Sequence, residues 1–253
     1  MQVTRINTAP TFGRAFTTKE KNDYKQTIEE ARKELDIKDT SAIVFDFNVP
    51  CEKGFNLGIG STYSDNMVKF TRFIQDMTGL NSVQLAPQGQ ISRHNVSPYS
   101  GTNFAYGEHL IDLKKLTTCK YGELLSENDI KNAVNEYPKD KTGLETLVDY
   151  DNILGIDNEQ GQQDKLLKKA FYNMAAKLSS KEASVAALSK EIELFEQENK
   201  SWLESELMFK ALTKEYGTSD YNKWSDEDRN LYSSATDNNK REQRIAQLKQ
   251  DNK

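Results

Sequence analysis

The sequence is poor in cysteine and histidine, and both shortages exclude kinds of site. Its two cysteines, Cys51 and Cys119, lie far apart with no Cys-x-x-Cys spacing, so the 253 residues contain neither a disulfide framework nor a zinc ribbon. The two histidines, His94 and His109, have no cysteine or carboxylate at metal-ligand spacing around them, which argues against a zinc site and a Ser-His-Asp triad. We interpret His94 as a surface residue and His109 as a partly buried structural residue. We therefore expect no metal and no cofactor.

Long apolar runs and an excess of positive charge are also missing. No uninterrupted apolar stretch approaches the ~18 residues of a membrane span, and the amino terminus has no apolar signal region. The chain has 34 Lys and Arg residues against 39 Asp and Glu residues, a net charge of -5. An acidic chain without a basic block cannot displace counterions from a nucleic-acid backbone. We therefore expect a cytoplasmic protein that binds neither membranes nor nucleic acids.

The residues that are present indicate a folded chain that begins with an extension, residues 1–40. Aromatic residues make up 9% of the sequence, too many for a wholly disordered chain. Thr17 and Glu20 fit a capping box at the start of a helix. Apolar side chains then recur at helical spacing and should share one face: Tyr24, Ile28, Ala31 and Leu35.

Residues 41–88 predict a strand, a helix and a second strand. Segment 41–49 is rich in β-branched and aromatic residues and ends at Pro50, and segment 82–86 ends at Pro87. The helix between them ends at Gly79, and its apolar residues are Met67, Val68, Phe70, Phe73, Ile74 and Met77. This order predicts that the two strands are parallel.

Residues 89–232 predict a helical subdomain, and residues 233–253 a polar tail that is helical or disordered. One amphipathic helix ends at Ser179-Ser180. A second helix has an apolar stripe at steps of seven, but its companion positions are interrupted, which favours a core-packing helix over a coiled coil. The stripe consists of Leu188, Phe195, Trp202 and Phe209. The tail has almost no apolar side chains beyond Ile245 and Leu248.

Two further patterns are interpreted as structural. The glycine-rich segment 54–60 matches neither Gly-x-Gly-x-x-Gly nor Gly-x-x-x-x-Gly-Lys-Ser/Thr, so its glycines are assigned to tight turns and close packing rather than to a phosphate. The acidic pairs Asp149/Asp151 and Glu204/Glu206 lack the apolar setting of a tuned acid/base pair, so we interpret them as solvated.

The segment Ser97-Pro98-Tyr99 is the candidate binding site, because ligands of parallel α/β folds collect beyond the carboxyl ends of the strands. A rigid proline beside an aromatic ring, with hydroxyl and amide groups around it, suits a sugar. On this chemistry alone, Tyr99 as an ordinary loop anchor is the simpler alternative.

Several short motifs occur in one order between residues 42 and 230. They are Val83-Gln84-Leu85-Ala86-Pro87, Ser97-Pro98-Tyr99, Leu110-Ile111-Asp112-Leu113, Val148-Asp149-Tyr150, the helix from Leu166 to Met174, and Trp202-Leu203-Glu204 followed by Trp224. In this order and spacing, the sequence resembles the amino-terminal half of 4-α-glucanotransferases of the amylomaltase family, glycoside hydrolase family 77.

The resemblance implies an α/β, helix-rich fold: the first strands of a partial TIM (β/α)8 barrel with a large helical insertion subdomain. It implies transfer of α-1,4-glucan segments between maltodextrins by a retaining double displacement, with an Asp nucleophile, a Glu acid/base and a stabilising Asp. By their match to the family's S-P-Y motif, Ser97, Pro98 and Tyr99 are implied to bind the glucan.

The sequence departs from the family where the chemistry should be. The three carboxylates belong to motifs of the type R-x-D-H, E-D-L-G and T-H-D-N, and none of these occurs here. Segment 45–50 stands where the family tends to have H-P-T-S-L-P, Asn95-Val96 replaces a Gly-Asp pair, and Leu154 replaces an aromatic. We therefore expect no catalytic residue in this chain and no activity of the chain alone.

These departures leave three hypotheses for function. In the first, the chain is the amino-terminal part of a glucanotransferase, and its partners are an α-1,4-glucan or maltodextrin and a complementary C-terminal barrel half. In the second, it is a non-catalytic helical glucan-binding or scaffold protein derived from that family. In the third, it is a regulatory glucan-binding module.

Overall fold

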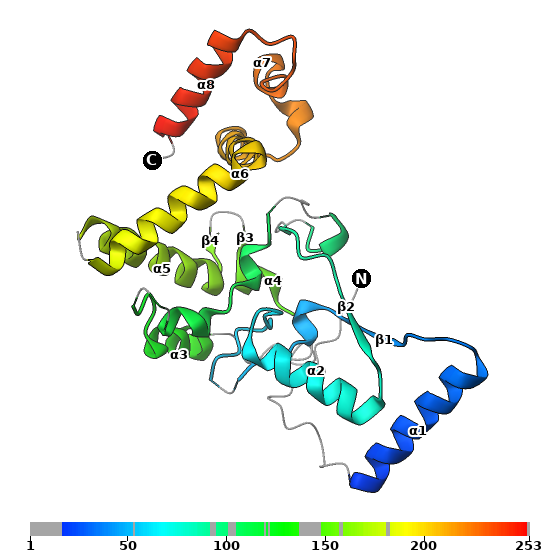
Figure 1. The fold of residues 1–253 in the computed structure, drawn as a ribbon. Coiled ribbons are helices and arrows are strands. Elements are labelled where there is room, and N and C mark those ends of the chain that lie inside the picture. Colours follow the sequence, from blue (N-terminus) through cyan, green and yellow to red (C-terminus); the bar gives the residue numbers. More distant parts are fainter. Residues whose placement is uncertain are drawn as a thin grey trace. The chain divides into compact units, whose positions relative to one another are not determined.

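The computed structural model describes the chain in nine segments: residues 17–52, 54–91, 95–100, 105–118, 120, 122–136, 148–156, 159–180 and 183–251. The chain forms two compact units, Met1–Val185 and Ala186–Lys253 (Figure 1). The boundary between them falls inside the segment 89–232 that the sequence predicts as one helical subdomain.

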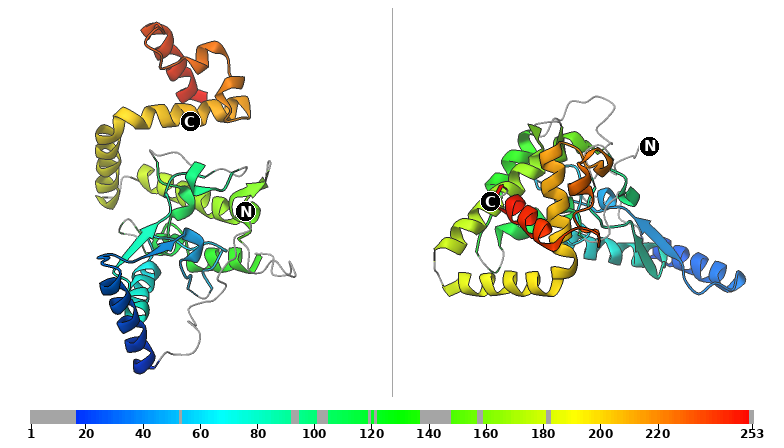
Figure 2. Two further views of the ribbon diagram at one scale, coloured as in Figure 1. Left: turned by 90° about the vertical axis from the view of Figure 1, so that its right-hand side faces the viewer. Right: turned by 90° about the horizontal axis from the view of Figure 1, so that it is seen from above.

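Helix α1 (Thr18–Glu34) begins with the predicted capping box. The Thr17 amide donates to Glu20 Oε2 at 2.9 Å, and the Glu20 amide donates to Thr17 Oγ1 at 3.2 Å. The predicted apolar face is only partly confirmed, because Ile28 is half-buried whereas Tyr24 is exposed, and no residue of α1 is fully buried. The helix lies against α2 (Asp65–Thr78), as Figure 2 also shows, and Arg32 Nη2 donates to the Gly79 carbonyl at 3.2 Å.

The predicted strand, helix and strand are confirmed, with α2 between β1 (Ser41–Val44) and β2 (Ser82–Leu85). The strands are parallel, in a register that runs from Ser41 opposite Ser82 to Val44 opposite Leu85. Apolar side chains from β1, the following loop and α2 form a core: Val44, Val49, Met67 and Ile74. Gly79 ends α2 with a φ of 68°, in the left-handed region that favours glycine.

The first strand is shorter than predicted. It ends at Val44, and Asp46–Asn48 form a 3-10 turn in place of the expected strand continuation to residue 49. The Asn48 amide donates to the Phe45 carbonyl at 2.9 Å, which bends the backbone out of the strand direction. The rings of Phe45 and Phe47 consequently stack on each other at 5.2 Å between centroids. This turn also directs Asp46 into the protein, where it is buried.

The rest of the first unit is built from helices and short turns. Strands β3 (Gly155–Ile156) and β4 (Glu159–Gln160) form an antiparallel pair, and the helices are α3 (Glu127–Glu136), α4 (Tyr150–Leu154) and α5 (Gln162–Ser179). Helix α5 ends at Ser179, as the Ser179-Ser180 pair in the sequence predicted. Its core contacts include α3 and nearby loops, with buried residues Leu57, Leu124, Leu125, Ile130, Ala133, Leu166 and Ala170.

The second unit has its own hydrophobic core, formed by the end of α6 (Ala183–Tyr216), α7 (Asp226–Arg229) and α8 (Asn238–Asp251). The tail is helical, and its two apolar residues, Ile245 and Leu248, are buried in this core. Their companions are Met208, Ala211, Leu212, Trp224 and Leu231. The predicted stripe of α6 is not a core stripe throughout, because Phe195 is half exposed.

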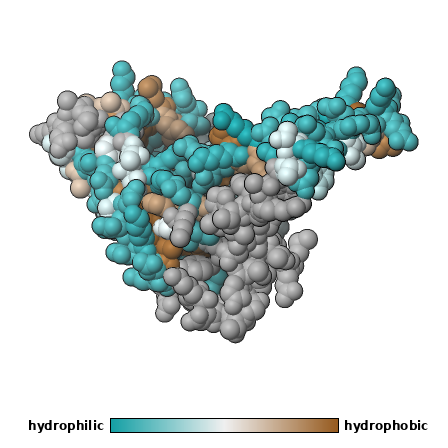
Figure 3. Space-filling view, turned by 90° about the horizontal axis from the view of Figure 1, so that it is seen from below, coloured by the Kyte–Doolittle hydropathy of each residue, from teal (hydrophilic) through white to brown (hydrophobic). Residues whose placement is uncertain are grey.

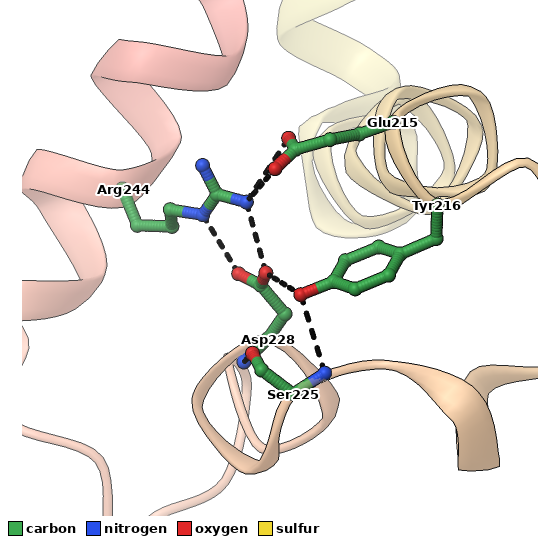
Figure 4. Close-up of polar contacts among 5 residues, drawn as sticks. All are labelled: Glu215, Tyr216, Ser225, Asp228 and Arg244. Carbon is green, nitrogen blue, oxygen red and sulfur yellow. Dashed lines mark hydrogen bonds and ion pairs between the residues drawn. The ribbon is translucent and has the colours of Figure 1, made fainter.

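A buried ion pair joins α7 to α8 (Figure 4). Arg244 Nε donates to Asp228 Oδ1 at 2.7 Å, and Arg244 Nη2 donates to Asp228 Oδ2 at 2.8 Å and to Glu215 at 2.9 Å. The Tyr216 hydroxyl donates to Asp228 Oδ2 at 2.8 Å. Burial acts to raise the pKa of Asp228, but the hydrogen bonds from Arg244 and Tyr216 outweigh it and lower that pKa. Asp228 is therefore ionised at neutral pH.

The surface is predominantly hydrophilic where Figure 3 draws it, with small separate hydrophobic areas. Within the described residues, no helix is both long enough and apolar enough to cross a membrane.

Candidate functional site

Three polar side chains meet beyond the carboxyl ends of the parallel strands. Asp46 follows β1, Gln88 follows β2, and His109 belongs to a short 3-10 turn, Glu108–Leu110. We call this group the Asp46 cluster. The loops at this end of a parallel sheet commonly carry functional side chains.

Both carboxylate oxygens of Asp46 are engaged. Gln88 Nε2 donates to Asp46 Oδ1 at 3.1 Å, and His109 Nε2 lies 3.3 Å from Asp46 Oδ2. The side chains of His109 and Asp46 are both buried, and Thr62 Oγ1 donates to Gln88 Oε1 at 2.5 Å. These contacts make Asp46 a clamp between loops, and its side chain is only 9% exposed.

Gly107 makes room for the imidazole in this clamp. A Cβ at position 107 would lie 2.2 Å from His109 Cε1 and 2.9 Å from the Gly89 carbonyl oxygen, closer than real Cβ atoms approach. The Gly107 amide also donates to the Gln88 carbonyl at 2.9 Å. The backbone of this loop is therefore tied to β2 by contacts that a larger residue would disturb.

The charge of Asp46 contributes to the raised pKa values of two tyrosines. Burial, and secondarily the Asp46 charge, raises the pKa of Tyr150 to about 12. The pKa of Tyr63 is also raised, first by burial, then by the charge of Tyr106 and a hydrogen bond with it, and finally by Asp46. Both phenols are therefore protonated at neutral pH.

Two hollows share His109 and Gln163 among their lining residues. Their volumes are about 180 Å³ and about 250 Å³. Gln163 Nε2 donates to the His109 carbonyl at 2.9 Å, while Gln163 Oε1 has no hydrogen-bond partner among the described residues although the side chain is buried. Burial raises the pKa of Asp112 in the wall of the smaller hollow, against the opposing effect of the Lys114 amide.

The predicted sugar-binding residues lie in a separate turn. Pro98–Ser100 form a 3-10 turn, Ser97 and Pro98 are half-buried, and Tyr99 is 71% exposed. The turn is held by Asn95, whose Oδ1 accepts from the Ser97 amide at 3.1 Å and whose Nδ2 donates to Ser100 Oγ at 2.9 Å. Within the described residues, no hydrogen bond or ring contact connects Tyr99 to the Asp46 cluster.

The remaining predictions for candidate sites have mixed outcomes. The glycine segment is structural as predicted, since a Cβ on Gly60 would lie 2.1 Å from the Val49 carbonyl oxygen and Gly58 has a φ of 107°. His109 is more deeply buried than predicted, and His94 and Cys119 fall outside the described residues. No group of three or more His, Cys, Asp or Glu side chains that could hold a metal occurs in the described part of the chain.

Sequence reasoning did not identify the Asp46 cluster. Asp46 and His109 are 63 positions apart, and no spacing rule brings such residues together. A signal was available, because a polar residue follows each strand closely at the end where parallel sheets place their sites. The predicted strand continuation through Asp46 concealed it.

The family comparison agrees with the resemblance of the sequence motifs. The glycoside hydrolase family 77 model, described as 4-alpha-glucanotransferase, matches residues 52–250. No curated protein and no solved structure matches the chain significantly.

Proposed function

Because the chain belongs to the 4-alpha-glucanotransferase family, glycoside hydrolase family 77, we propose that it is the glucan-holding, amino-terminal part of such an enzyme in the cytoplasm. In this role it binds an α-1,4-glucan or maltodextrin for a retaining transfer to another sugar. The carboxylates that break the bond come from elsewhere in the enzyme. The observation that carries the proposal is the placement of the family's Ser97-Pro98-Tyr99 motif beyond β2, in a turn that presents Tyr99 to solvent.

The construction of this turn supports a binding role. The Asn95 side chain bonds the Ser97 amide on one side of Tyr99 and the Ser100 hydroxyl on the other, which holds the turn that carries the exposed ring. An exposed ring on an ordered turn can stack on the C–H face of a pyranose at a lower ordering cost than a ring on a mobile segment. Ser97 and Ser100, which flank this segment in the sequence, each carry a hydroxyl group that could bond the sugar.

The surroundings of Asp46 support the proposal that the catalytic carboxylates come from another part of the enzyme. Retaining transfer needs two carboxyl groups about 5–5.5 Å apart, one of them free to attack the sugar. Asp46 is the carboxylate nearest the ends of β1 and β2 in sequence, but His109 and Gln88 occupy both of its oxygens. Its side chain is also nearly inaccessible, so a sugar cannot reach it as a nucleophile requires while this clamp is intact.

The sheet supports a complementary barrel half as the partner. In the described part of the chain, β1 and β2 pair only with each other, and Ile43 and Leu85 are exposed. Parallel strands are normally covered on both faces and paired at both edges. Further strands beside β1 and β2 would complete a (β/α)8 barrel around the glucan.

The alternative function is a non-catalytic glucan-binding or scaffold protein derived from the family. It is favoured by the second unit, which has a hydrophobic core of its own. A neighbouring reading frame with the R-x-D-H, E-D-L-G and T-H-D-N motifs supports the enzyme, and the absence of such a frame supports the scaffold.

Replacing Tyr99 with alanine tests the proposed function. We expect Tyr99→Ala to weaken maltoheptaose binding by roughly tenfold, because the ring supplies the stacking surface. Tyr99→Phe keeps the ring and should bind within about twofold of the parent chain. Isothermal titration calorimetry measures both affinities, and equal affinities for the parent and Tyr99→Ala would contradict the proposed role.

A further inference from the structure

We propose that Tyr63 and Tyr106 form a second α-glucan-binding surface, distinct in its residues from the Ser97-Pro98-Tyr99 turn. We call this pair the tyrosine platform. Its rings are 5.7 Å apart between centroids and inclined at 70°, so they make two walls of an open corner. Tyr63 belongs to the loop after β1 and Tyr106 to the segment after β2, so both follow the carboxyl ends of the parallel strands. The proposal rests on the proposed function, because it takes the same class of ligand.

Both rings are exposed although their backbones are firmly held. Tyr106 is 72% exposed and Tyr63 is 48% exposed. Residue 106 forms an antiparallel bridge with Gly89, and the next amide along the chain donates to the Gln88 carbonyl at 2.9 Å. The Tyr63 amide donates to Ser61 Oγ at 3.1 Å, and its carbonyl accepts from Lys115 Nζ at 2.9 Å. Fixed exposed rings bind at a low ordering cost.

The chemistry of the pair suits a carbohydrate. An aromatic face accepts the C–H surface of a pyranose, and a phenol at its rim exchanges hydrogen bonds with sugar hydroxyls. The pKa of Tyr63 is raised by burial and by Tyr106, so its hydroxyl remains protonated. A nucleic acid is a poor occupant, because the chain carries a net charge of -5.

A polar hollow is lined by residues that are close in sequence to the platform. Gln90 lies one residue after Gly89, and Glu108 lies two residues after Tyr106. Gln90 Nε2 donates to Glu108 Oε1 at 3.4 Å, and both side chains line the hollow of about 250 Å³. Gln163 also lines this hollow, and its Oε1 has no hydrogen-bond partner among the described residues. Acceptors of this kind favour a ligand that is rich in hydroxyl groups.

The platform is tested by titrating the full chain with maltoheptaose and, separately, with the β-linked glucan cellohexaose. Because the two surfaces are separate, we expect the parent chain to show two maltoheptaose sites. Tyr106→Ala should weaken one of them by roughly tenfold and Tyr63→Ala the same one by several-fold, while Tyr106→Phe stays within about twofold. The matched control is Tyr172→Ala, because Tyr172 is 59% exposed and makes a similar edge contact with Phe171 at 5.9 Å on α5. This control should bind like the parent chain.

The possible results separate the platform from the proposed function. Loss of affinity in Tyr106→Ala but not in Tyr99→Ala supports the platform and contradicts the proposed role of Tyr99. Loss in Tyr99→Ala only, with Tyr106→Ala folded by circular dichroism, overturns the platform alone. No binding by the parent chain, equal binding of cellohexaose, or concentration-dependent dimerisation abolished by Tyr106→Ala would each overturn the platform as a glucan site.

Discussion

Arg244→Met should destabilise the second unit by about 3–5 kcal/mol, because it leaves Asp228 buried and unpaired. The Asp228 side chain is nearly inaccessible, and Arg244 supplies two of its hydrogen bonds (Figure 4). Both tryptophans of the sequence, Trp202 and Trp224, lie in this unit. Urea unfolding followed by tryptophan fluorescence therefore reports on the second unit alone.

Arg229→Met is the matched control for this variant. Arg229 also pairs with an aspartate, Asp226, but that partner is largely exposed, so the expected loss is at most about 1 kcal/mol. Adding Asp228→Leu to Arg244→Met should recover part of the lost stability, because it removes the unpaired charge. Equal effects of Arg244→Met and Arg229→Met would show that the buried pair does not hold α7 to α8.

The same pair predicts how the second unit responds to acid. The pKa of Asp228 is lower in the folded chain than its unfolded value of about 3.9, so the folded state binds fewer protons there. Its stabilising contribution is complete above that value and is lost as the pH falls through the folded pKa. In Arg244→Met this source of acid destabilisation should be largely absent, which urea titrations at neutral and acidic pH can measure.

The second large effect is expected at the Asp46 cluster. Asp46→Ala should destabilise the first unit by about 3 kcal/mol, because it leaves the buried His109 imidazole without its acceptor and removes one of the two acceptors of the Gln88 amide. The Gly107 amide, which donates to the Gln88 carbonyl, should then exchange its hydrogen faster. Hydrogen exchange followed by nuclear magnetic resonance measures this loss site by site.

Asp76→Ala is the control for Asp46→Ala. Asp76 pairs with Lys25 at 3.9 Å on the surface, and both side chains are exposed, so its removal should cost at most about 1 kcal/mol. The double variant Asp46→Ala/His109→Ala should lose less than the sum of the two single variants, because each single change leaves the other partner unsatisfied. Additive losses, or an Asp46→Ala chain as stable as Asp76→Ala, would contradict the clamp.

Local patterns predicted the parts of the fold that depend on neighbouring residues. The capping box of Thr17 and Glu20, the end of α2 at Gly79 and the parallel pair β1 and β2 all follow from nearby residues. The two apolar residues of the tail also mark where α8 meets its core. These features need no knowledge of the rest of the chain.

Features that depend on distant contacts could not be predicted in this way. The early end of β1 reflects the burial of Asp46 against Gln88 and His109, which belong to later segments. The exposure of Phe195 likewise depends on which neighbours α6 meets, although its spacing fits the apolar stripe. The proposed sugar-binding role of Ser97-Pro98-Tyr99 comes from the resemblance, whereas the tyrosine platform became visible only when loops after different strands were placed together.

The central claim is that this chain holds the glucan but does not supply the groups that cleave it. The most direct test is incubation of the purified chain with maltotriose, followed by chromatographic separation of the maltodextrins formed. We expect maltotriose to remain unchanged. Production of glucose together with maltopentaose by the chain alone would contradict the claim.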